Sequence, residues 1–146
     1  MRITKALFLL TLPAILAGCP STGVGDPCTP ESTPMGGFQA AEAYLETSSV
    51  QCRTRVCMVY RLAGDPTQSK EDCLLEGLAP AVCDAFPART ELDERVFCTC
   101  RCDTGVPGDD TPVCECGEGF ECTEILEQGG VGIRGSYCVR NEALDG

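Results

Sequence analysis

The chain has 146 residues, 13 cysteines, no histidine and a formal net charge of −11. An acidic chain without a basic patch cannot replace the counterions of phosphates, which argues against nucleic acid as a partner. The lack of histidine removes the most common general base and a frequent zinc ligand. Catalytic triads that use histidine and zinc sites that use histidine are therefore excluded. These limits favour a protein that is not an enzyme.

Residues 1–18 have the three parts of an export signal. Arg2 and Lys5 give a basic start, residues 6–16 form an apolar run, and two small residues follow it. A transmembrane helix needs about 20 apolar residues, so this run is too short to span a membrane. We therefore expect a signal peptide that is cleaved.

The string Leu16-Ala17-Gly18-Cys19 resembles the lipobox of bacterial lipoproteins at all four positions. The resemblance implies that a diacylglycerol is attached to the sulfur of Cys19, that the signal is cut before Cys19, and that the new amino group is acylated. Two or three acyl chains hold a protein on a membrane stably. In Gram-negative members of this family an aspartate after the cysteine retains the protein at the inner membrane. Pro20 stands there instead, so the resemblance implies the outer membrane.

Cysteine counting supports the lipidation of Cys19, because it leaves an even number of other cysteines. Exported proteins reach an oxidising compartment in which disulfides persist, so we expect six bridges whose pairing the sequence leaves open. Each bridge contributes about 2–4 kcal/mol, which supplements a core with few aromatic residues. The alternatives are a disulfide at Cys19, metal binding by thiolates, and redox catalysis. The twelve expected disulfide residues are Cys28, Cys52, Cys57, Cys73, Cys83, Cys98, Cys100, Cys102, Cys114, Cys116, Cys122 and Cys138.

The first half of the mature chain predicts a tether, a helix and a strand. Residues 20–37 are rich in Pro, Gly, Ser and Thr and are typical of a flexible tether, which is shorter if Cys28 pairs with the folded body. Residues 38–46 carry apolar side chains at helical spacing among Ala and Glu, which predicts a short helix. Residues 54–62 alternate as a strand does.

Ser69, followed three residues later by Asp72, is a typical helix N-cap. The helix that it begins is expected to end before Gly77. Residues 81–86 predict a further turn of helix, and residues 87–94 an exposed, charged connection. The residues that we expect the first of these helices to bury are Cys73, Leu74 and Leu75.

The last third holds the most closely spaced cysteines. Residues 96–102 predict a strand, residues 103–112 a loop, and residues 113–116 a second strand that returns against the first. Because side chains alternate along a strand, the cysteines of each strand are expected to share one face. A turn with Phe120 as an aromatic anchor follows, and residues 136–140 predict a closing strand.

The string Cys-x-Cys-x-x-Gly-Phe at 114–120 is similar to the C-terminal half of EGF-like modules. The final cysteine of such modules has no counterpart, since Cys122 lies too near and Cys138 too far. We therefore interpret the similarity as convergent turn chemistry.

Asp103, Asp109 and Asp110 lie together in the loop at 103–112. Three carboxylates in such a loop are candidate calcium ligands. The spacing is not that of an EF-hand, and Asp and Gly are ordinary turn residues. A solvated turn is therefore the first interpretation and a calcium site the alternative.

The sequence as a whole predicts a small disulfide-rich, β-dominated α+β domain, with short antiparallel strands and two or three short helices. It covers residues 38–146, as one domain or as modules at about 38–90 and 91–146, behind a lipidated tether at 19–37. The function hypothesis is non-enzymatic binding or display in a bacterial cell envelope, with a protein or an envelope polymer as partner and no cofactor. The alternatives are a protease inhibitor, a thiolate or calcium metal-binding protein, and a carboxylate-based hydrolase.

Overall fold

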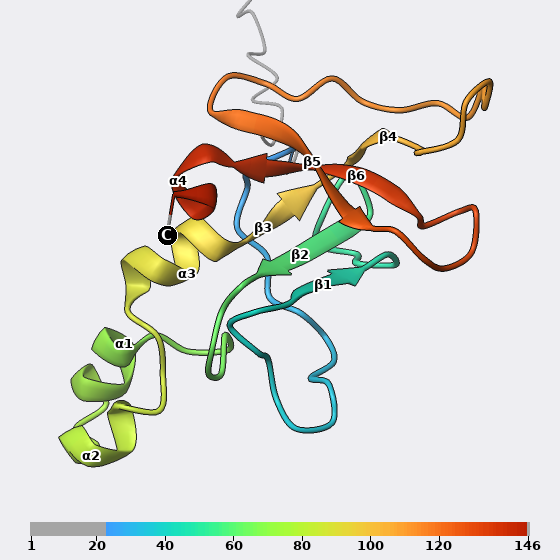
Figure 1. Cartoon of the computed structure of the whole chain (residues 1–146). Helices are drawn as coiled ribbons and strands as arrows, with labels where there is room; N and C mark the ends of the chain where they lie inside the picture. The colour runs from blue at the N-terminus through green and yellow to red at the C-terminus, as the bar shows by residue number, and fades with distance from the viewer. Residues whose placement is uncertain (1–22, 146) are drawn as a thin grey trace, which may run out of the picture.

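The computed structural model describes residues 23–145 (Figure 1). The expected signal peptide at 1–18 and the expected lipidation site Cys19 lie outside these residues. The described part contains two three-stranded antiparallel sheets and four short helices, which confirms the disulfide-rich α+β fold class. In chain order the elements are β1 (Ala43–Glu46), β2 (Val56–Tyr60), α1 (Lys70–Leu75), α2 (Pro80–Cys83), α3 (Arg89–Arg95), β3 (Val96–Thr99), β4 (Arg101–Asp103), β5 (Phe120–Leu126), β6 (Gly135–Arg140) and α4 (Asn141–Leu144).

The two sheets are joined by a direct passage of the chain from one to the other. The first sheet has the order β1-β2-β3 and the second has the order β4-β6-β5. The chain passes from one sheet to the other at Cys100, between β3 and β4, and the main-chain oxygen of Cys100 accepts a hydrogen bond from the amide of Cys138 in β6 (3.1 Å). The strand predicted over 96–102 is therefore two strands with different partners.

The core lies on both faces of β2. Met58 and Tyr60 point toward the second sheet and join Phe97 of β3 with Tyr137 and Val139 of β6 in one buried cluster. Cys57 and Val59, which alternate with Met58 and Tyr60 along β2, point to the opposite face of the sheet and belong to a second buried cluster. The members of this second cluster are Cys28, Phe38, Cys52, Cys57, Val59, Leu62, Val96 and Cys98.

Six disulfides link the twelve cysteines of the described part. Three of them lie before Thr99 and three lie after it, so no bridge joins the two stretches. In the second stretch the bridges lie close together, with the sulfur of Cys114 only 3.7 Å from that of Cys138. The pairs are Cys28–Cys57, Cys52–Cys98, Cys73–Cys83, Cys100–Cys114, Cys102–Cys122 and Cys116–Cys138.

A short N-terminal segment covers the outer edge of β3. The amide of Gly25 donates to the oxygen of Cys98 (2.8 Å), and the amide of Cys98 donates to the oxygen of Asp26 (2.7 Å). The guanidinium of Arg140 donates to the oxygen of Gly25 and lies 5.2 Å from the ring centre of Phe120. Gly25 and Asp26 therefore pack against the folded body, and the Cys28–Cys57 disulfide holds the chain just beyond them.

The helix predicted over residues 38–46 is wrong, because this segment ends in the strand β1. Tyr44 and Leu45 occupy opposite faces of the first sheet, and each contacts a different core cluster. A helix would place neighbouring side chains about 100° apart and would lose the pairing of β1 with β2. Tertiary pairing here overrides the helix propensity of Ala and Glu.

Two further predictions are corrected in the second half. The connection expected over 87–94 forms α3, whose side chains are mostly charged, with Leu92 packed on the core. Residues 113–116 form no strand, and only the amide of Cys114 bonds to the strand before it, at the oxygen of Arg101 (2.9 Å). β4 pairs instead with β6. The chain after the turn expected around Phe120 forms β5, which reaches Leu126 and pairs with the other side of β6. The strands predicted over 54–62 and 136–140 are confirmed as β2 and β6.

Candidate binding surface

The α1–α2 hairpin carries four exposed large apolar side chains within nine consecutive residues. Every residue from 74 to 82 is exposed. Soluble domains seldom expose contiguous apolar patches, and such patches mark interaction sites. Figure 1 shows the hairpin projecting away from both sheets. We call its four large apolar residues the apolar tip: Leu74 (42% exposed), Leu75 (84%), Leu78 (45%) and Val82 (53%).

One disulfide decides which way the hairpin faces. Cys73 and Cys83 are fully buried and bonded to each other, with their Cα atoms 5.5 Å apart. Leu74 and Leu75 follow Cys73 directly, so they point away from the bridge. The expectation that both leucines are buried is therefore wrong, and only Cys73 is buried in α1. A helix of six residues is too short to bury three consecutive side chains.

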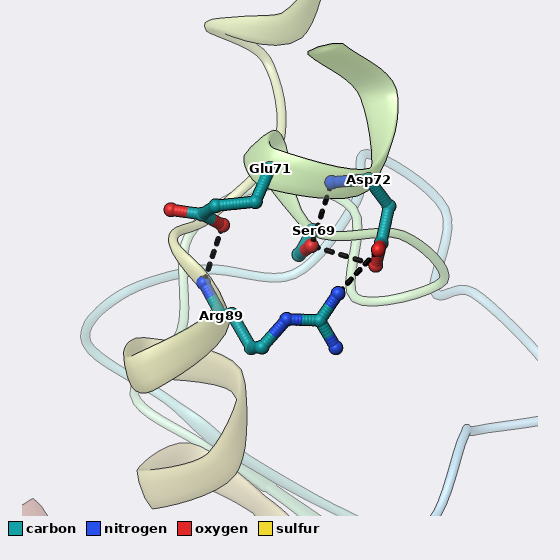
Figure 2. A network of polar contacts seen from close by, with 4 residues as sticks. All are labelled: Ser69, Glu71, Asp72 and Arg89. Atoms are coloured by element: carbon teal, nitrogen blue, oxygen red, sulfur yellow. Dashed lines mark hydrogen bonds and ion pairs between the residues drawn. The ribbon is translucent and has the colours of Figure 1, made fainter. Parts of the chain in front are cut away.

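The base of the hairpin is held by a polar network (Figure 2). The hydroxyl of Ser69 accepts the amide hydrogen of Asp72 (3.1 Å) and donates to the carboxylate of Asp72 (2.7 Å), which confirms the predicted N-cap. The guanidinium of Arg89 at the start of α3 pairs with the same carboxylate. The amide of Arg89 donates to the Glu71 carboxylate (2.9 Å). The network therefore ties α1 to α3.

These contacts also shift the acidity of the carboxyl groups. The hydrogen bond from Ser69 lowers the pKa of Asp72, and the nearby Arg89 adds to this. Main-chain amides, including that of Arg89, lower the pKa of Glu71. A general acid needs the opposite shift, toward neutral pH. The network is therefore suited to holding the hairpin rather than to transferring protons.

A second ion pair closes the other side of the hairpin. The ammonium group of Lys70 in α1 lies 2.6 Å from the carboxylate of Asp84, which follows α2. Both side chains are partly exposed, so this pair contributes little to stability. Together with the disulfide it fixes the direction in which α2 leaves α1. The base of the apolar tip is therefore held by three kinds of contact: the disulfide, the Lys70–Asp84 ion pair and the polar network.

The three aspartates proposed as calcium ligands do not come together. The Asp103 carboxylate accepts from the amide of Gly105 (2.5 Å), and the Asp109 carboxylate accepts from the amide and hydroxyl of Thr111 (2.9 and 2.6 Å). The hydrogen bonds from Thr111 lower the pKa of Asp109. Among residues 23–145, groups of three candidate ligand atoms within 4.8 Å consist of cysteine sulfurs, so Asp110 and its neighbours form no such group.

The cysteine groups are explained by disulfides. The sulfurs of Cys100, Cys114 and Cys138 lie within 4.8 Å of one another, but all belong to bridges. A metal takes thiolates as ligands, and a bridged sulfur carries no such charge. The structure therefore gives these sulfurs a cross-linking role.

Comparison with known proteins gives no relative for this chain. No protein-family model matches it, no curated protein matches it, and no solved structure matches its fold. Within residues 23–145, no helix is both long enough and apolar enough to cross a membrane.

Proposed function

We propose that this chain is a lipid-anchored protein of a bacterial cell envelope that binds another protein through the apolar tip. The anchor is Cys19, at the end of the string that resembles a lipobox, and Pro20 favours the outer membrane. Six disulfides in a chain of this size fit an oxidising compartment outside the cytoplasm. The membrane contact is made by acyl chains and the partner contact by the folded body.

The apolar tip is the observation that carries the binding role. Leu75 exposes 84% of its surface at the end of a hairpin that a disulfide holds rigid. Rigid presentation lowers the entropy lost on binding. Four aliphatic side chains offer no hydrogen bonds to a sugar polymer, whereas an apolar groove in a protein buries them. We therefore propose a protein partner rather than an envelope polymer.

Charge around the tip indicates what surrounds the partner's groove. Glu71, Glu76 and Asp84 flank the apolar residues, and Lys70 is already paired with Asp84. An apolar groove with Lys or Arg at its rim is the complementary surface. Rim charges affect the association rate more than the final affinity, so binding should be faster at low ionic strength.

A non-enzymatic role agrees with the carboxyl chemistry. The carboxyl groups of Glu71, Asp72 and Asp109 all have lowered pKa values. A carboxylate-based hydrolase needs one carboxyl with a raised pKa opposite an ionised one. These three carboxyl groups lie on a turn or at a helix end and serve as hydrogen-bond acceptors.

The anchor is tested by intact mass measurement of protein extracted from membranes. We expect a chain that begins at Cys19 and carries the added mass of acyl chains. Alkylation is expected to add nothing before reduction and twelve adducts after it, one for each bridged cysteine. A chain that starts elsewhere, or that carries no lipid, would overturn the anchor without affecting the binding proposal.

The binding role is tested by placing a photo-reactive amino acid at Leu75 in the cell that makes the protein. The control position is Val131, a side chain of similar exposure (75%) in the loop before β6. We expect one cross-linked protein from Leu75 and none from Val131. With that protein purified, Leu75→Asp should weaken binding by about tenfold or more, and Val131→Asp should leave it unchanged. Equal cross-linking at both positions would contradict the proposal.

A further inference from the structure

Within residues 23–145, the first sheet has one edge that no other segment covers, and this edge is β1. This strand pairs with β2 on one side only. The amide of Arg61 donates to the oxygen of Glu42 (2.9 Å), which fixes the alternation of bonds along the pair. Tyr44 and Glu46 therefore direct their main-chain groups toward β2. The main-chain groups of Ala43 and Leu45 point outward, and no described residue bonds to them.

The other sheet edges are covered or guarded. Gly25 and Asp26 bond to Cys98 and so cover the edge of β3, and the amide of Cys114 bonds to the edge of β4. The edge of β5 carries exposed glutamates and a register shift between Glu124 and Leu126. Such features keep other strands from pairing with an edge. β1 has neither a cover nor a bulge.

A hollow of about 260 Å³ lies beside this open edge. It is lined by Cys57 and Val59 of β2 and by Pro34 of the loop that precedes β1. Phe38 and Tyr44 line it with their rings 5.1 Å apart in an edge-to-face arrangement. Side chains alternate along a strand, so every second side chain of a strand added to β1 would point over this hollow.

The hollow is lined by aromatic and aliphatic side chains together with the hydroxyl groups of Ser32 and Thr33, and it has carboxylates at its border. Glu46 lines it, and its carboxylate also accepts from the amide of Glu31 (2.7 Å). Glu42 accepts the hydroxyl of Tyr44 (2.8 Å), and this contact raises the pKa of Tyr44. The lining contains no Lys or Arg. Aromatic rings beside carboxylates suit a cationic side chain with an aliphatic stem.

We propose that β1 accepts an extended basic segment of a partner protein as an added strand of the first sheet. The outward main-chain groups of Ala43 and Leu45 bond to the segment, and one Lys or Arg side chain enters the hollow beside Tyr44 and Glu46. Strand addition of this kind takes its affinity from main-chain bonds and its specificity from a pocket for alternate side chains. The site is independent of the apolar tip, which lies on the hairpin at another part of the fold (Figure 1).

The test uses the full oxidised chain and a labelled peptide of about ten residues in which valine alternates with lysine. The control peptide replaces each lysine by glutamate. Fluorescence anisotropy should show the lysine peptide bound at least about tenfold more tightly than the acidic one, with the difference reduced by salt. Hydrogen exchange should slow at the amides of Ala43 and Leu45. The amides of Tyr44 and Glu46, already bonded to β2, should not change.

Two variants separate the parts of the site. Ala43→Pro removes an outward amide hydrogen, a change that edge strands tolerate, and should abolish binding. Glu46→Gln keeps the fold and should weaken only the lysine peptide, by about threefold to tenfold. The matched control is Glu124→Gln on β5, which should have no effect. Equal binding of both peptides, protection at β5 instead of β1, or pairing of two copies of this chain through β1 would each overturn the proposal.

Discussion

The hydroxyl of Thr99 donates a 2.6 Å hydrogen bond to the main-chain oxygen of Cys138 inside the core. Thr99 is the last residue of β3 and is fully buried, while Cys138 lies in the middle of β6. The amide of Cys138 donates to Cys100, the next residue along. The hydroxyl of Thr99 thus supplies a hydrogen-bond donor where the chain passes from the first sheet to the second. This hydrogen bond links the two sheets, which no disulfide does.

Thr99→Val is therefore expected to destabilise the protein. Valine keeps the shape of threonine but leaves the buried oxygen of Cys138 without its donor, which costs about 1–3 kcal/mol. The measurement is guanidinium unfolding with the disulfides intact. Thr90→Val, at an exposed position of α3, is the control and should change stability little. An unchanged midpoint for Thr99→Val would show that the hydroxyl is not needed at the junction.

The pairing of β4 with β6 depends on Gly135, the first residue of β6. Its φ of +127° is one that side chains rarely adopt, and a β-carbon there would collide with the main-chain oxygen of Asp103 in β4. Gly135→Ala should cost at least about 2 kcal/mol. Gly132→Ala, where a β-carbon meets nothing, should be neutral. Equal unfolding midpoints for the two variants would contradict this account.

The features that could be predicted from the sequence are those fixed by local residues. The alternation around Val56–Tyr60 predicted β2, and Ser69 with Asp72 predicted the start of α1. The segment that ends in β1 was predicted as a helix because Ala and Glu favour one locally, and only its pairing with β2 decides otherwise. The partner of β4 lies more than thirty residues further on, in β6, and no local pattern reveals such a pairing.

The candidate surfaces could be predicted less well than the fold. Leu74 and Leu75 were expected to be buried because leucine is among the residue types most often found inside proteins. The short length of the helix was the signal against this expectation. A helix that ends before Gly77 has room for only one narrow buried face, and Cys73 occupies that face. The hollow beside β1 joins Pro34 to Val59, residues that the sequence keeps apart. Only the folded chain brings them together.

Acid should loosen the hairpin before it unfolds the sheets. The pKa of Asp72 is held below its ordinary value of 3.8, chiefly by the hydrogen bond from Ser69. A carboxyl whose pKa is lower in the folded state stabilises that state fully above its unfolded pKa, and this stabilisation is lost as the pH falls through the folded pKa. The loss therefore falls below about pH 4.

The measurement is hydrogen exchange of the α1 amides between about pH 6 and pH 2, corrected for the intrinsic pH dependence of exchange. Asp72→Asn should show weaker protection than the unmodified protein at pH 6, a difference that narrows as the pH falls, and a smaller further loss of its own on acidification. Glu94→Gln, an exposed carboxylate on α3, is the control and should behave as the unmodified protein does. A pH profile that Asp72→Asn leaves intact would show that other carboxylates control the hairpin.

The six disulfides should open in an order set by their exposure. Thiol–disulfide exchange requires the attacking thiolate to reach a sulfur. Cys122 is exposed and its partner Cys102 is half-buried, whereas Cys73 and Cys83 are fully buried. Limited reduction of the folded protein, followed by alkylation and peptide mapping, should label Cys102 and Cys122 first and Cys73 and Cys83 among the last. The order should disappear in denaturant. Early labelling of Cys73 would mean that the hairpin opens locally, and the apolar tip would then be a mobile segment rather than a rigid one.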